Sequence, residues 1–244
     1  MPTTSKFTQL GIALLLFSQL LSASAGASSK VSSGLTYTRI GDITEYFVPL
    51  KFVRSEEGYY LSVTGGWIHD VGGEDDVQGI GDTSIYGVVY DVLYFSQASV
   101  GVDLQGGIKL PTARNELGSG EVDYQAGVSA SRYDRSGVWV LSADVRIAGG
   151  GDDGRDREDT DAVEADSVML TFGRLFSLVS DHRLGIFYDV VQEQSEDDRA
   201  HTLSFYLNSP TSVAGLRLKP FFLYGFSGVT EAAVSGGLLL EYAF

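Results

Sequence analysis

Cysteine is absent from the sequence, proline (5) and histidine (3) are rare, and basic residues (17) are far fewer than acidic ones (32). The absence of cysteine excludes disulfide frameworks, thiol catalysis and zinc sites built on cysteine. The formal net charge of −15 argues against nucleic acid as a partner, because phosphate binding requires a basic surface. Beyond Ala27 the chain also lacks an apolar run long enough for a transmembrane helix.

The abundant residues are glycine, tyrosine and phenylalanine, at 30, 13 and 13 of 244 positions. With 43% hydrophobic residues, the composition is not that of a disordered chain. The length is that of one domain, able either to bury a core or to close a barrel.

The first 25 residues have the pattern of a secretion signal. Lys6 precedes an apolar run from Leu10 to Leu21, and Ala23-Ser24-Ala25 supplies the small residues that a signal peptidase reads. The run is shorter than the ~20 apolar residues of a membrane-spanning helix, which disfavours an anchor. We therefore expect residues 1–25 to be a cleaved signal peptide, followed by a short N-terminal segment, 26–33, in an exported chain.

The rest of the chain alternates between apolar and polar residues. From Ser99 to Leu110, one face carries apolar side chains while Asp103, Gln105 and Lys109 fall on the other. Successive side chains of a strand point to opposite faces, so such a segment is a strand with one apolar and one polar surface. The same division recurs in segments around residues 122–131, 139–147 and 202–208.

The expected strands are long enough to cross a bilayer. Most span about 10–14 residues, above the ~5–6 usual in globular proteins and close to the ~9–11 of a tilted transmembrane strand. They are expected at roughly 35–40, 44–55, 58–70, 82–95, 98–111, 121–133, 138–149, 166–179, 182–195, 199–209, 214–227 and 230–244. We predict an all-β fold over 34–244, an antiparallel up-and-down transmembrane β-barrel of about 12 strands. The alternative is a water-soluble β-sandwich.

The expected links alternate between short and long, as periplasmic turns and external loops do in such barrels. This alternation gives an even strand count, with the chain ending on the periplasmic side. Three residues conflict with the pattern. Pro49 and Pro220 lie inside expected strands and require a bulge or a shifted boundary. Arg174 falls on the lipid-facing side, where a position near the membrane boundary lets it reach the head groups.

The last strand ends in Tyr242-Ala243-Phe244. Tyr242 and Phe244 share a face with Val234, Leu238 and Leu240, so they are expected in the inner aromatic girdle at the membrane boundary. An apolar terminal strand ending in an aromatic residue also resembles the signal that outer-membrane proteins present to the barrel assembly machinery, which we expect as a partner. The alternative is the terminal strand of a sandwich.

Three glycine-rich segments resemble one known family. They are Gly79-Ile80-Gly81-Asp82, then Gly106-Gly107-Ile108-Lys109-Leu110-Pro111-Thr112, then Leu117-Gly118-Ser119-Gly120 with Asp123-Tyr124-Gln125-Ala126-Gly127. The chain is similar in them to the outer-membrane transporter family labelled "MetA-pathway of phenol degradation", over residues 42–244. The family's usual Pro-Thr-Gly is Pro111-Thr112-Ala113 here. The resemblance implies a barrel in the outer membrane of a Gram-negative bacterium, in contact with lipid and lipopolysaccharide, that passes small, often aromatic or hydrophobic, compounds.

The sequence carries only weak signals for catalysis and for metal binding. Barrel phospholipases use a serine and a histidine, but none of His69, His182 and His201 lies in a nucleophile motif, and His201 and Ser204 are expected on opposite faces. The acidic segment 149–161 lacks the ligand spacing of a calcium loop, which favours a solvated external loop. We expect no enzyme activity, no cofactor and no resident metal.

The polar faces of the strands would line the barrel interior with charges of both signs. The residues expected there are Glu45, Lys51, Asp91, Asp103, Gln105, Lys109, Asp123, Asp144, Arg146, Asp189, Arg217, Lys219 and Glu241. Such side chains select solutes in an open channel. In the alternative, a structural or surface-interaction barrel, the same charges pair and plug the interior, with Asp103 and Asp144 as partners of Lys109 and Arg146. An autotransporter translocator ranks third, because no passenger precedes the barrel.

Overall fold

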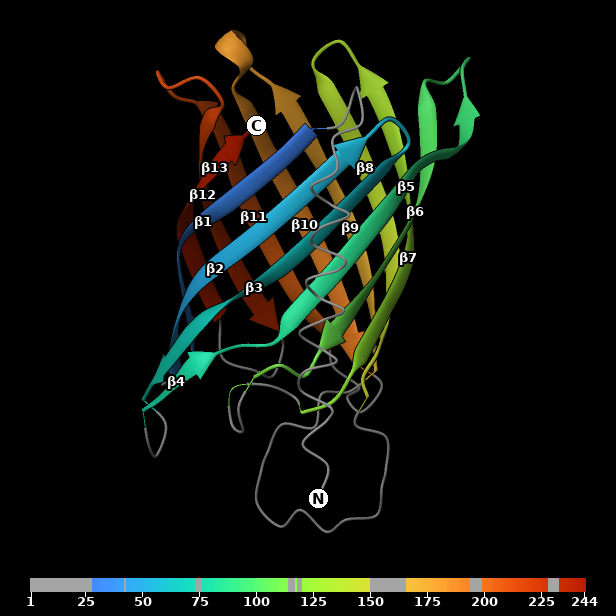
Figure 1. Ribbon diagram of the computed structural model, residues 1–244. Helices are drawn as coiled ribbons and strands as arrows, with labels where there is room; N and C mark the ends of the chain where they lie inside the picture. The colour runs from blue at the N-terminus through green and yellow to red at the C-terminus, as the bar shows by residue number, and fades with distance from the viewer. Residues whose placement is uncertain are drawn as a thin grey trace, which may run out of the picture.

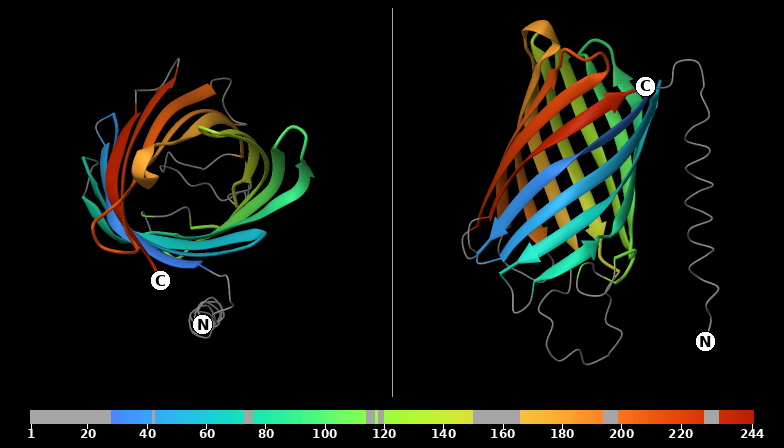
Figure 2. Two further views of the ribbon diagram at one scale, coloured as in Figure 1. Left: turned by 90° about the horizontal axis from the view of Figure 1, so that it is seen from above. Right: turned by 60° about the vertical axis from the view of Figure 1, so that its left-hand side comes forward.

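A computed structural model shows a closed antiparallel β-barrel (Figures 1 and 2). It describes residues 28–41, 43–72, 76–113, 117, 120–149, 166–193, 199–227 and 233–244. The expected signal peptide and residues 150–161 of the acidic segment lie outside these ranges.

The described residues form long strands. These are β1 (Ser28–Ile40), β2 (Ile43–Glu56), β3 (Tyr59–Val71), β4 (Val77–Ile80), β5 (Thr83–Phe95), β6 (Val100–Leu110), β7 (Asp123–Asp134), β8 (Gly137–Ile147), β9 (Ser167–Ser177), β10 (Arg183–Glu193), β11 (Arg199–Pro210), β12 (Leu216–Ser227) and β13 (Ala233–Ala243), with a 3-10 turn η1 (Val179–Asp181). Within the described ranges, no helix is long and apolar enough to cross a membrane.

The strands pair in an up-and-down order that closes on itself. Each pairs with its neighbours in sequence, and β1 pairs with both β2 and β13. The short β4 and the longer β5 both pair with β3, so they form one interrupted strand of the wall. The described barrel therefore has twelve strand positions, which confirms the predicted fold class and number.

The two ends of the barrel differ in their connections. The C-terminus lies at the end with the short turns, such as Glu57–Gly58 and Arg135–Ser136 (Figure 1). The two longest connections, after β6 and β8, are both at the other end. In barrels of this kind the short turns are periplasmic, so we call the two ends periplasmic and external.

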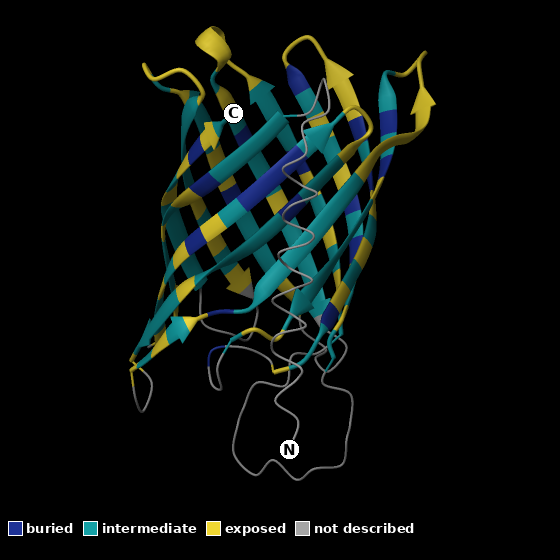
Figure 3. Cartoon of the chain, viewed as in Figure 1, coloured by how far each residue is buried: buried dark blue, intermediate teal, exposed yellow. Residues whose placement is uncertain are grey.

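Burial changes from residue to residue along the strands (Figure 3), because successive side chains of a strand point in turn to the outer surface and to the interior. In β13, Leu238, Leu240 and Tyr242 are exposed outside, whereas Glu241 between them is only 6% exposed and faces inward. Phe244 continues the outer row and stacks on Tyr242, with ring centroids 6.4 Å apart. The terminal aromatic pair therefore faces outward at the periplasmic end.

Aromatic side chains also gather on the outer surface towards the external end. His69 lies between Tyr46 and Trp67, and His201 stacks on Tyr188 and Phe226. Such a belt is typical of the membrane boundary of a barrel. Both histidines therefore belong to the outer surface. Ser204 is fully buried on the inner face, which confirms that His201 and Ser204 point in opposite directions.

The first strand begins earlier than expected. Residues 28–33 were assigned to a segment outside the barrel, but β1 starts at Ser28 and Lys30 already pairs with Ala243. Four of these six residues are serines, whose small side chains produce no apolar alternation for a sequence pattern to detect. The strand pairing of β1, which closes the barrel, supplies the information that the local sequence lacks.

Pro49 and Pro220 cause neither a bulge nor a shifted boundary. Opposite Pro49, the register between β1 and β2 is the same before and after the proline, from Ser33↔Leu50 to Thr36↔Phe47. β11 and β12 likewise keep their register on both sides of Pro220. The expectation of an irregularity at these prolines was wrong, because each ladder is interrupted locally while the neighbouring pairs keep the strands aligned.

Arg174 does face outward, but its charge is compensated within the protein. Its Nη2 donates to Asp134 Oδ2 at 2.9 Å and to Ser136 Oγ, and its guanidinium lies over the rings of Trp139 and Phe176. An arginine paired with a carboxylate and stacked on aromatic rings is less costly at a membrane boundary than an isolated one.

Candidate functional site

All thirteen residues predicted to line the interior lie on its inner face. The strand registers place them on one continuous surface together with buried side chains such as Ser32 and Ser142. Asp91 reaches this surface through an irregularity between Val89 and Leu93, where β5 has two more residues than its partner β6. Asp91 there has a positive φ of 50°, and its backbone N–H donates to Asp103 Oδ1 at 2.8 Å.

Two interior carboxylates are held by uncharged donors. Asp103 accepts hydrogen bonds from the backbone of Asp91 and from Ser129 Oγ. Asp144 accepts from the side-chain amides of Gln105 and Gln125. Among the described residues neither carboxylate has an ion-pair partner, and their exposed fractions are 8% and 3%. Both place a carboxylate without a cationic partner among the described residues on this side of the interior.

The pairing of Asp103 and Asp144 with Lys109 and Arg146, considered for the plugged alternative, is not formed among the described residues. Asp123 takes both cations, with its Oδ2 at 2.6 Å from Lys109 Nζ and 2.7 Å from Arg146 Nη2. Direct cross-strand neighbours decide this outcome, because Lys109 lies opposite Asp123 in the register of β6 and β7. With Asp91, Asp103, Asp123 and Asp144 against two cations, β5 to β8 form an acidic wall.

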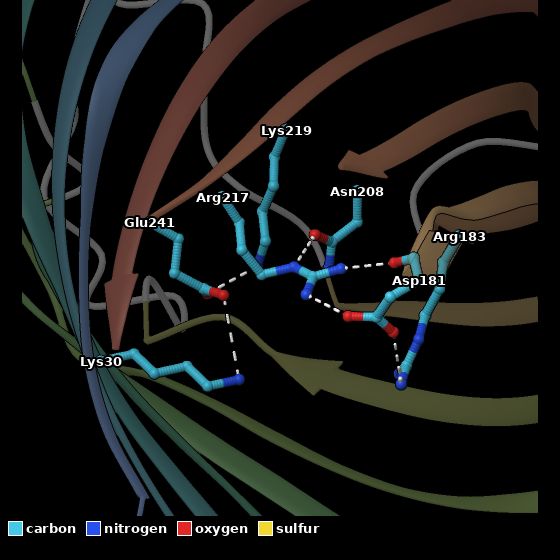
Figure 4. Close-up of polar contacts among 7 residues, drawn as sticks. All are labelled: Lys30, Asp181, Arg183, Asn208, Arg217, Lys219 and Glu241. Atoms are coloured by element: carbon cyan, nitrogen blue, oxygen red, sulfur yellow. Dashed lines mark hydrogen bonds and ion pairs between the residues drawn. The ribbon is translucent and has the colours of Figure 1, made fainter. Parts of the chain in front are cut away.

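The opposite charge dominates at the periplasmic end of the other wall (Figure 4). Four cations, Lys30, Arg183, Arg217 and Lys219, surround two carboxylates there; we call these four the basic cluster. Arg217 is engaged at all three of its nitrogens, since it donates to Asn208 Oδ1, to Asp181 Oδ2 at 2.7 Å and to the Asp181 backbone oxygen. The hydrogen bond from Arg217 holds the pKa of Asp181 below its usual range.

The other three cations of the basic cluster pair with Glu241 or with the second carboxylate oxygen of Asp181. Glu241 contacts Lys219 Nζ at 2.5 Å and Lys30 Nζ at 3.8 Å, and Asp181 contacts Arg183 Nη2 at 4.0 Å. Arg183 and Lys30 thus each have one ion pair at the limit of contact distance, and their side chains are 52% and 34% exposed. Four cations against two carboxylates leave an excess of two positive charges.

A group of three aromatic residues, the aromatic shelf, adjoins the basic cluster on the same wall. It consists of Phe187, Tyr206 and Phe221, with ring centroids 5.8 Å apart for Phe187–Tyr206 and 6.3 Å for Tyr206–Phe221. The register places Tyr206 opposite Gly185, two residues along β10 from Arg183. Although it faces the interior, Tyr206 is 41% exposed.

The rings of the shelf lie against the wall over glycines. A Cβ added to Gly185 would stand 2.7 Å from Phe187 Cε2, and one at Gly237 would stand 2.7 Å from Phe221 Cε1. Gly173 is likewise covered by the Phe187 ring. A glycine on a strand marks a close approach of another group, here an aromatic ring that lies along the barrel surface.

Sequence patterns missed part of this surface. Lys30 lies in the portion of β1 that was not recognised as a strand. Arg183 was within an expected strand but next to its turn, where the inner and outer faces are hard to assign. The interior aromatic rings were not foreseen because alternation predicts polar residues inside; the inward position of Tyr206, between Ser204 and Asn208, was the available signal. Among the described residues, no group of three metal-ligating side chains is present.

No family model and no curated protein matches the chain, whereas many solved structures share its fold. The COG4313 outer membrane channel from Pseudomonas putida F1 aligns with a TM-score of 0.66 at 12% identity, over 91% of this chain and 97% of that one. The KdgM porin in complex with disordered oligogalacturonate aligns at 0.55 and 10%, over 88% and 99%. The translocator domain of the autotransporter NalP from Neisseria meningitidis aligns at 0.51 and 10%, over 99% and 97%.

These similarities establish the outer-membrane barrel fold. Because channels and a translocator domain share that fold, it does not distinguish between their functions. The distinction has to come from the interior surface.

Proposed function

We propose that this protein is a passive channel for small polar or charged molecules in the outer membrane of a Gram-negative bacterium. The observation that carries the proposal is the position of the large interior side chains. Phe187 and Phe221 lie along the wall over glycines, and Tyr206 keeps 41% of its surface exposed inside the barrel. Residues that filled the interior would instead cross it and be buried, as in small closed barrels.

The arrangement of the interior charges supports the same conclusion. The pairs Lys109–Asp123 and Arg146–Asp123 join adjacent strands, as does Lys219–Glu241. Ion pairs along the wall leave charges of both signs beside the passage, whereas a plug needs pairs across it. Fixed charges next to a narrow aqueous path select solutes by charge and size.

The alternative is a structural barrel with a plugged interior, and the close packing of Asp103, Asp123 and Asp144 is the observation in its favour. We also keep as proposals the relation to the phenol-degradation transporter family, the contacts with lipid and lipopolysaccharide, and recognition of Tyr242 and Phe244 by the assembly machinery. The polar interior favours charged or polar solutes over purely hydrophobic ones.

Conductance of the purified protein in planar bilayers tests the proposal. We expect steady ion current from the wild type, and a lower current from Gly185→Val, whose added side chain displaces the Phe187 ring towards the interior. Gly236→Val is the matched control, because a Cβ there meets only ordinary contacts at 3.4 and 3.8 Å on the outer face. A folded wild type that carries no current at any voltage would leave the structural barrel as the function.

A further inference from the structure

We propose that the periplasmic end of the interior binds a carboxylate carried on an aromatic ring. This inference rests on the proposed channel function and names the class of solute that the channel prefers. The carboxylate would bind at Arg183, within the field of the basic cluster, and the ring would lie on the aromatic shelf.

The cations of the basic cluster differ in whether their hydrogen-bond donors are available to a ligand. Arg217 uses Nε, Nη1 and Nη2 for Asn208 and Asp181, so it is a positioning residue rather than a ligand contact. Arg183 is 52% exposed, and the one ion pair that it makes within the described ranges, at 4.0 Å, leaves its donors available. A guanidinium with free donors binds a carboxylate through two parallel hydrogen bonds.

The charge balance favours an anion at this position. Glu241 is nearly buried between Lys219 and Lys30, and Asp181 is held by Arg217. The two carboxylates therefore each have a close cationic partner, while the cluster as a whole keeps two excess positive charges. An incoming carboxylate reduces this excess without displacing an existing close pair.

The aromatic shelf determines what should be attached to that carboxylate. Arg183, Gly185 and Phe187 follow one another on the inner face of β10, and Tyr206 lies opposite Gly185 on β11. Since Gly185 has no side chain, the Phe187 ring lies over it, and no other side chain of β10 on this face stands between the guanidinium and that ring. An aromatic ring that packs on Tyr206 in an offset or edge-on geometry is favoured by more than its buried area.

The experiment measures binding and current separately. Isothermal titration calorimetry of the detergent-solubilised, folded barrel determines the affinity for benzoate, acetate, benzyl alcohol and benzylammonium. Block of the ion current by the same four compounds is measured in planar bilayers. We expect benzoate to bind most tightly, because it alone presents both the carboxylate and the ring with the right charge.

Three variants separate the contributions. Arg183→Gln should weaken benzoate binding by at least about fivefold, the order expected for a lost charge-assisted hydrogen bond in a partly hydrated site. Tyr206→Leu should weaken benzoate but leave acetate unchanged. Lys109→Gln is the control: it also removes an interior cation, but one that pairs with Asp123 on the acidic wall. Folding of each variant is checked by its faster gel migration before boiling.

Equal effects of Arg183→Gln and Lys109→Gln would overturn the site, as would tighter binding of acetate or benzylammonium than of benzoate. A wild type that binds benzoate but carries no current would refute the channel and leave the site. A wild type that conducts but does not distinguish the four compounds would refute the site and leave the channel.

Discussion

Asp103 and Lys219 occupy corresponding positions on opposite walls of the barrel. Each is the fourth residue from the periplasmic end of its strand, and β6 and β12 are six positions apart in either direction around the described barrel. Asp103 belongs to the acidic wall and Lys219 to the basic cluster. In the proposed channel, a solute near this end would pass between surfaces of opposite charge, and the field between them would act across its path.

Neutralising the two walls should change ion selectivity in opposite directions. Asp103→Asn with Asp144→Asn removes negative charge and should make the channel more anion-selective, whereas Arg183→Gln with Lys30→Gln should make it less so. The reversal potential in a potassium chloride gradient measures both shifts. Shifts of the same sign in the two double variants would contradict the assignment of the walls.

Asp123→Asn should destabilise the barrel more than Asp103→Asn. Asp123 holds both Lys109 and Arg146, whose side chains are 21% and 38% exposed, while Asp103 is bonded to neutral donors. We expect a loss of about 2 kcal/mol, below the value for a fully buried pair because the cations are partly hydrated. Urea unfolding in vesicles, followed by the fluorescence of Trp67 and Trp139, measures the difference, and equal midpoints for the two variants would refute it.

Acidification should raise anion selectivity through Asp181. Its pKa is depressed in the folded state by the hydrogen bond from Arg217, so its stabilising contact is fully present above the unfolded value of about 4. The contact is lost as the pH falls through the lower, folded-state pKa. Protonation there adds one positive charge to the net charge of the basic cluster and its carboxylates. Reversal potentials between pH 7 and pH 3 should show this change in the wild type and a smaller one in Asp181→Asn.

The orientation can be tested by labelling, because the chain contains no cysteine of its own. A cysteine at Asp76, beyond β3 at the external end, should react with an impermeant thiol reagent on intact cells. One at Arg135, in the turn between β7 and β8, should react only after the outer membrane is disrupted. The reverse pattern would invert the barrel.

Phe244→Gln should reduce the yield of assembled barrel more than Ala243→Gln. Phe244 stacks on Tyr242 at the outer surface, and it is 61% exposed, whereas Ala243 faces inward. Quantifying the heat-modifiable form in isolated outer membranes measures assembly. Phe244 also donates its backbone N–H to the backbone oxygen of Ser29. If Phe244→Leu recovers the yield that Phe244→Gln loses, assembly needs an apolar side chain at this position rather than this backbone contact.

The sequence alone determined the architecture and the facing of its side chains. Alternation has a period of two, so one correctly identified apolar residue assigns the face of a whole strand, and the alternating link lengths then assign the two ends. For this reason the strand number, the outward Tyr242 and the inward Asp103 could all be predicted. The same rule fails where successive side chains do not differ in polarity, as in the serine-rich start of β1, and where aromatic residues face inward.

Only the tertiary structure decided which interior charges pair. Lys109 and Arg146 were equally compatible with Asp103, Asp123 or Asp144 by parity, and the register of β6, β7 and β8 selected Asp123. The basic cluster likewise depends on barrel closure, which brings Lys30 of β1 to Glu241 of β13 from opposite ends of the chain. Parity is a local property of each strand, whereas register and closure arise from long-range pairing, and the interior surface is produced by both.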